Sequence, residues 1–120
     1  MPINHGRRLL LPSAARTATT ASPVLRNRRH RGIQVVLVVT AASGTGGLTI
    51  HIQQVDRDSG NAIDLAVDAA VITATGTYGF QMAPGAGSAT PLYLPTDFQV
   101  EVAHGDGSSY TYSLSCTLLE

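Results

Sequence analysis

Alternation of apolar and polar residues runs through the chain from residue 33 onward and predicts β-strands. Residues 33–41 are almost entirely aliphatic, which predicts a central strand covered on both faces. Four further segments repeat apolar residues at every second position, the period of a strand with one buried face: 48–53, 78–82, 98–102 and 110–118.

Turns rich in Gly, Asp and Ser separate these segments at short, regular spacing. Residues 63–67 and 69–75 predict further short strands, with a brief helix over 62–70 as the alternative. A total of seven or eight strands without a helical repeat indicates an all-β fold. We therefore predict a small antiparallel β-sandwich or jelly roll.

The first 32 residues lack this alternation, and we interpret them as an extended basic N-terminal arm. Residues 1–16 have no helical or strand period, which predicts an irregular segment. Residues 17–25 are β-prone, but Pro23 restricts a strand there to the edge of a sheet. The predicted organisation is an arm over 1–32 and a β-sandwich body over 33–120.

Charge divides the chain at the same place. The body has one arginine and eight acidic residues, a formal charge of −7, and the net charge of the whole chain is zero. Such asymmetry is typical of an interaction tail or of self-association. The arm contains no acidic residue and seven arginines, which are the candidate partner-binding residues: Arg7, Arg8, Arg16, Arg26, Arg28, Arg29 and Arg31.

These arginines admit three interpretations. A run of like charges is most often a solvated tail. Binding of nucleic acid would set the arginines against phosphates, but the arm lacks interleaved aromatic residues and the acidic body would repel those phosphates. Docking on protein carboxylates suits the forked guanidinium group, and we favour it, with another protein or another copy of the body as the partner.

Patterns for catalysis or metal binding are weak. The turn over 56–61 is similar to a calcium loop but lacks two of its carboxylates, so a hairpin turn is the better interpretation. The chain has no nucleophile elbow, paired acidic motif or phosphate-binding loop. We predict no enzyme activity, metal or cofactor. The histidines lie on separate segments without metal-ligand spacing: His5, His30, His51 and His104.

Cys116 is the single cysteine, and its place in the alternating segment predicts a buried, unreactive thiol. No apolar run approaches the roughly 20 residues of a membrane-spanning helix. The apolar run after Arg7 and Arg8 stops at Pro12 after three leucines, so an export signal is not predicted. In the Gly- and Pro-rich loop over 84–97, three apolar residues are candidate exposed contacts: Leu92, Tyr93 and Leu94.

Short segments of the chain, taken in order, resemble small virion proteins of tailed bacteriophages over about residues 17–119. Residues 1–16 have no counterpart in this resemblance. The segments are Arg31-Gly32 before a strand ending in Val39-Thr40-Ala41, then Ser43-Gly44-Thr45-Gly46, Leu48-x-Ile50-x-Ile52-Gln53, 72–78, Pro84-Gly85, Leu94-Pro95 and Tyr112-Ser113-Leu114-Ser115.

The resemblance implies a capsid decoration, or cement, protein. Such a protein binds the outer surface of the capsid shell, stabilises the shell and has no catalytic residues. The implied partners are the major capsid protein and other copies of the chain, most plausibly in a homotrimer. The implied location is the virion surface, after assembly in the host cytoplasm, with no role for a membrane.

Two alternatives remain open. The first is a β-sandwich module that binds carbohydrate or a host surface through Leu92, Tyr93 and Tyr110. The absence of tryptophan and the few aromatic residues argue against it, because sugars usually stack on aromatic rings. The second is another head or tail structural protein, including one associated with nucleic acid.

Overall fold

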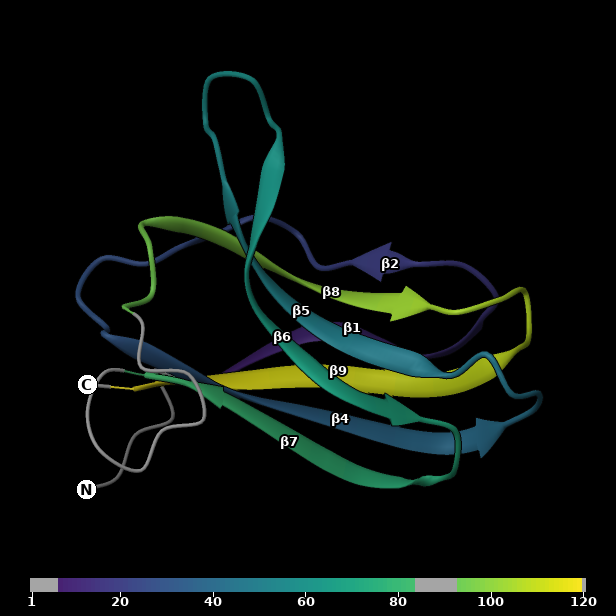
Figure 1. Ribbon diagram of the computed structural model, residues 1–120. Coiled ribbons are helices and arrows are strands. Elements are labelled where there is room, and N and C mark those ends of the chain that lie inside the picture. Colours follow the sequence, from purple (N-terminus) through teal and green to yellow (C-terminus); the bar gives the residue numbers. More distant parts are fainter. Residues whose placement is uncertain (1–6, 84–92, 120) are drawn as a thin grey trace, which may run out of the picture.

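The computed structural model describes residues 7–83 and 93–119, and every regular element in this part of the chain is a β-strand (Figure 1). The all-β prediction is confirmed. The alternative of a helix over 62–70 is wrong, because these residues belong to β6. The strands are β1 (Arg7–Arg16), β2 (Thr20–Ala21), β3 (Leu25–Arg26), β4 (Gly32–Ala42), β5 (Leu48–Val55), β6 (Ala62–Ile72), β7 (Gly76–Met82), β8 (Asp97–His104) and β9 (Tyr110–Leu119).

The strands form two antiparallel sheets that pack face to face (Figure 1). Sheet A has the order β1-β9-β4-β7, and sheet B has the order β2-β8-β5-β6, with β3 also paired to β8. When β2 and β3 are taken as two parts of one edge strand, this is the eight-stranded order of a jelly roll, which contains two Greek keys. The predicted sandwich is therefore confirmed.

The core lies between the two sheets and follows from the period of two. On β4, Ile33, Val35 and Leu37 are fully buried, and each lies directly opposite a buried residue of β9. Sheet B contributes its own alternating set from β5 and β8. Burial of one such side chain stabilises the fold by about 1.5–3 kcal/mol.

The outer face of β4 differs from the prediction. Its side chains Gln34, Val36 and Val38 are only half-buried, so the strand is covered on one face and not on both. No described element packs over this side of sheet A. The aliphatic residues there reflect the preference of β-branched side chains for strands, and this preference misled the prediction.

The prediction of an irregular segment over residues 1–16 is wrong for its described part, residues 7–16. These residues form β1, which pairs with β9 and places Leu10 and Leu11 in the core. The pairing register shifts between Leu9 and Leu11 and again before Ala14. A β-bulge of this kind lets two successive residues face inward, which removes the period of two from the sequence.

The predicted edge strand over 17–25 is present as two short pieces. β2 and β3 lie on either side of Pro23 at the edge of sheet B, where both pair with β8. Between them, the backbone N–H of Ser22 donates to the carbonyl of Val100, and the Ser22 hydroxyl accepts from the Val100 N–H. Residues 7–32 therefore belong to both sheets and do not form an arm separate from the body.

Candidate functional site

An arginine-lined groove of about 200 Å³ lies at the end of the sandwich where β1 begins and β9 ends. It gathers side chains from three parts of the chain, namely β1, β9 and the segment from β3 to β4. Within the described residues, no carboxylate lines it. We call it the arginine groove, and its lining residues are Arg8, Arg26, Arg28, Arg29, His30 and Leu118.

Strand pairing places the first wall of the arginine groove. Arg8 lies directly opposite Cys116 on β9, and Cys116 faces the core. Residues opposite each other in an antiparallel pair project from the same face, so Arg8 lies on the inner face of sheet A at its open end. Leu118 follows Cys116 on the same face and supplies the apolar base of the groove.

Asn27 fixes the second wall. Its side chain is buried, its Nδ2 donates to the carbonyls of His30 (2.7 Å) and Leu94 (3.1 Å), and its Oδ1 accepts from the His30 N–H (2.9 Å). The Asn27 N–H also donates to the carbonyl of Thr96 at 2.7 Å. These bonds hold Arg28 and Arg29 on a turn that is tied to the segment before β8.

The chemistry of the arginine groove is anion binding. Each guanidinium is charged at neutral pH and presents a planar fork of N–H donors that matches a carboxylate or a phosphate. The nearby Cys116 is not a nucleophile, because burial raises its pKa to about 11, although the charge of Arg8 acts in the opposite direction. The groove can therefore hold an acidic group, and the buried Cys116 thiol is not available to attack it.

The structure divides the seven predicted arginines into three sets. Arg8, Arg26, Arg28 and Arg29 meet in the groove, whereas Arg7 and Arg31 are exposed outside it. Arg16 is used within its own sheet: its guanidinium donates to the carbonyls of Pro12 and Tyr112, both at 2.7 Å, and lies 4.7 Å from the centre of the Tyr112 ring.

The predicted loop contacts also divide. Tyr93 is 68% exposed, as expected, but Leu94 is only 6% exposed, so the prediction of an exposed Leu94 is wrong. Its backbone bonds to Arg31 and Asn27 turn the side chain into the core. Leu92 lies outside the described residues. Tyr110 was a candidate contact in the carbohydrate-binding alternative. It is fully buried and accepts a hydrogen bond from the Gly47 N–H, so it is not available to bind a sugar.

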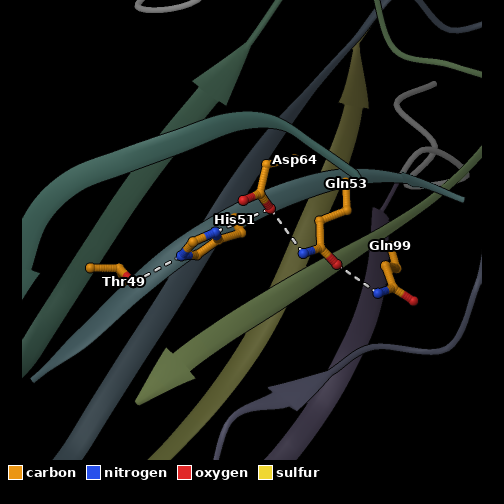
Figure 2. Close-up of polar contacts among 5 residues, drawn as sticks. All are labelled: Thr49, His51, Gln53, Asp64 and Gln99. Carbon is orange, nitrogen blue, oxygen red and sulfur yellow. Dashed lines mark hydrogen bonds and ion pairs between the residues drawn. The ribbon is translucent and has the colours of Figure 1, made fainter. Parts of the chain in front are cut away.

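A second polar feature crosses three strands of sheet B (Figure 2). Thr49 Oγ1 lies 3.0 Å from His51 Nε2, and His51 Nδ1 lies 3.2 Å from Asp64 Oδ1. Gln53 Nε2 donates to the same Asp64 oxygen at 2.9 Å, and Gln99 Nε2 donates to Gln53 Oε1 at 2.6 Å. β5 contributes three of these residues, β6 contributes Asp64 and β8 contributes Gln99.

The Thr49–His51–Asp64 chain has the order of a hydroxyl, imidazole and carboxylate relay. The hydrogen bond from Gln53 and the contact with His51 hold the pKa of Asp64 below its usual value, although partial burial opposes this. We interpret these five residues as a network that ties three strands together.

Two further features bear on function. In the described part of the chain, no group of three or more His, Cys, Asp or Glu side chains is arranged to hold a metal ion. Nor do residues 7–83 and 93–119 include a helix of the length and apolar character needed to cross a membrane. His30, His51 and His104 lie in different parts of the sandwich, and His5 lies outside the described residues.

No family model and no curated protein sequence matches this chain. Among solved structures, a chain described by the words "Bacillus endospore appendages form a novel family of disulfide-linked pili" is similar, with a TM-score of 0.40 and 14% sequence identity. The similarity covers 100% of this chain and 96% of that chain. At this level the likeness carries no argument about what this protein does.

Proposed function

We propose that this protein is a structural virion protein that decorates the outer surface of a phage capsid shell and stabilises the shell. The arginine groove is the observation that carries the proposal, because it presents four guanidinium groups from separate elements on one surface. The phage setting, the major capsid protein as partner and a homotrimeric state come from the sequence resemblance. In this role the groove binds carboxylates of the shell or of a neighbouring subunit.

The rest of the molecule suits such a role. A decoration protein makes many modest contacts with a repeated surface, and avidity multiplies weak contacts in a large assembly. The described residues offer a two-sheet scaffold and a polar network that ties three strands together. A groove of about 200 Å³ lined by arginines fits side-chain carboxylates better than a deep site for a small organic substrate.

The test is binding to undecorated shells assembled from the major capsid protein of the same source. We expect the protein to co-sediment with these shells, to raise their dissociation temperature, and to bind more weakly as salt rises, because exposed charge pairs are screened. The variant R26A/R28A/R29A should lower occupancy about tenfold or more at fixed concentration, since forked, charge-assisted bonds are lost.

The matched control is R7A/R31A, which removes two exposed arginines outside the groove. Its occupancy should stay within about twofold of the parent protein, as expected for charges outside the contact. Equal occupancy of the groove variant and the parent would remove the groove from the proposal. Absence of the protein from purified virions, together with no binding to shells, would reject the decoration role and leave another head or tail role as the alternative.

A further inference from the structure

Resting on this structural role, we propose that the arginine groove receives the acidic turn between β5 and β6 of a second copy of the chain. The copies would then associate head to tail, each giving its turn to one neighbour and its groove to another. The turn comprises residues 56–61, which we call the acidic turn. In this contact the carboxylates of Asp56 and Asp58 bind the groove of the neighbour, and both side chains are exposed.

The acidic turn is placed to reach another molecule. The β5–β6 hairpin projects away from the body of the sandwich, with this turn at its tip (Figure 1). Within one copy, no ion pair joins Asp56 or Asp58 to an arginine of the groove in the described part of the chain. These carboxylates therefore do not already pair with the groove arginines within the described part of one copy, and we assign that contact to a second copy.

The acidic turn is also rigid, which lowers the entropy lost on docking. Asp56 Oδ2 accepts hydrogen bonds from the Ser59 hydroxyl (2.7 Å) and the Ser59 N–H (3.3 Å). The Gly60 N–H donates to the Asp56 carbonyl at 2.7 Å, and Gly60 has a φ of 79°, which favours glycine. These bonds thus hold the backbone of the turn and the carboxylate of Asp56 in place.

The charge of the turn is negative despite the arginine within it. Arg57 NH2 lies 3.0 Å from Asp97 Oδ1 at the start of β8, so this guanidinium is already paired with a carboxylate outside the turn. An aspartate is ionised at neutral pH, and hydrogen bonds from Ser59 hold the pKa of Asp56 below its usual value. Asp56 and Asp58 together therefore offer two negative charges to the groove.

Groove and turn are matched in size and in charge. A groove of about 200 Å³ has room for one or two carboxylate side chains, whereas a helix about 10–12 Å across is much broader. The net charge of the chain is zero, so two copies approach without net repulsion and with opposite charges on the facing surfaces. A contact between two different patches is heterologous, and it gives a ring when the rotation closes, here the expected trimer.

The experiment measures self-association of the full chain without shells, by sedimentation velocity at low and high salt. We expect the parent protein to associate at low salt and to dissociate at high salt. The groove variant R26A/R28A/R29A and the turn variant D56N/D58N should each associate at least about tenfold more weakly, because each lacks one charged partner. Asparagine keeps the side-chain oxygen that the turn uses, so the turn variant retains its fold.

A mixture of the two variants gives the sharpest outcome. The intact groove of the turn variant can bind the intact turn of the groove variant, so equal amounts should form a one-to-one dimer and nothing larger. The control D68N/E101Q removes two acidic charges elsewhere in sheet B and should associate like the parent. Far-UV circular dichroism and unfolding midpoints establish that all variants are folded.

Three results would overturn the inference: no self-association at low salt, association of the turn variant equal to that of the parent, or no dimer in the mixture. In the second case, where only the groove variant loses association, the groove would be assigned to a different acidic surface. These outcomes are separate from the shell-binding test. A protein that binds shells but never self-associates retains the proposed function and loses this inference.

Discussion

β1 and the segment over residues 20–31 come from the same basic stretch of sequence, yet the fold uses them differently. β1 pairs with β9 along its length and sends two leucines into the core. The segment over 20–31 has only the two-residue strands β2 and β3, and it is held in place by the polar side chains of Ser22 and Asn27. Its Arg26, Arg28 and Arg29 line the arginine groove together with Arg8 from the start of β1, whereas Arg16 at the end of β1 bonds to its own sheet.

The difference teaches that the groups within reach of a guanidinium decide what an arginine can do. Arg16 follows a long paired strand, where carbonyls and an aromatic ring lie within its reach. Arg28 and Arg29 follow a short strand and lie on an exposed turn, so their donors face outward. Arg16 therefore has a structural role, whereas Arg28 and Arg29 lie where a partner can reach them. The predictions below test this contrast.

The largest effect is expected at Leu10, which is 5% exposed, in comparison with Leu9, which is 67% exposed. Leu10→Ala should lower the free energy of unfolding by about 2–5 kcal/mol, because it leaves a cavity in the core. Leu9→Ala should change it by no more than about 0.5 kcal/mol. Urea unfolding of both variants makes the comparison, and equal effects would show that β1 does not dock as described.

A smaller effect is expected at Asn27. Asn27→Ala removes donors from the carbonyls of His30 and Leu94, and buried groups left without a partner cost about 1–3 kcal/mol. Amide hydrogen exchange should quicken over residues 27–31 while β1 keeps its protection. Asn61→Ala in the exposed acidic turn is the control and should change the free energy of unfolding by no more than about 0.5 kcal/mol. Uniform loss of protection across β1 and residues 27–31 would contradict the contrast.

The sequence predicted the regular part of the fold and missed the irregular part. β9 follows the period of two, so this strand and the buried Cys116 were accessible from the pattern, whereas the one-sided cover of β4 was not. β1 was missed because its register shifts place Leu10 and Leu11 on one face. The inward turn of Leu94 depends on hydrogen bonds from residues far away in the chain, which no local pattern contains.

The candidate site was predictable in composition and not in geometry. The charge division marked the arginines as a group, but the pairing of Arg8 with Cys116 and the turn fixed by Asn27 decide which of them meet. One part of the polar network could be predicted from the sequence, since His51 lies on the polar face of its strand. Its partner Asp64 depends on the register of β5 and β6, which contains irregularities of its own.

Arg16 and Arg28 provide a matched pair for the next prediction. Arg16→Ala removes two hydrogen bonds to carbonyls and the stacking on Tyr112, and should lower the free energy of unfolding by about 1–2 kcal/mol. Arg28→Ala should change it by no more than about 0.5 kcal/mol, because that side chain is exposed. Thermal and urea unfolding measure both. A larger loss at Arg28 than at Arg16 would reverse the assignment of structural and partner-binding roles.

The smallest expected effect is the change in stability with pH that comes from His104. This residue contacts Tyr112, whose ring lies under the Arg16 guanidinium. His104 Nε2 lies 2.9 Å from the Tyr112 hydroxyl, and its Nδ1 is buried with no hydrogen-bond partner in the described part of the chain. Burial, and secondly the charge of Arg16, lower the pKa of His104 below its usual value of 6.5, while Asp106 acts in the opposite direction.

The sign of the pH effect follows from this lowered pKa. Below pH 6.5 the unfolded chain binds the proton more readily than the folded chain, so the contribution of His104 to stability is complete above 6.5 and decreases as pH falls toward the folded pKa. Urea unfolding of the parent protein should therefore show lower stability at pH 5.5 than at pH 7.5, and His104→Gln should flatten this difference. Arg16→Ala should raise the pKa of His104 in an NMR titration, because a repelling charge is removed. An unchanged His104 titration in Arg16→Ala would show that Arg16 does not act on His104. It would thereby contradict the structural role given to Arg16 in the comparison of the two basic segments.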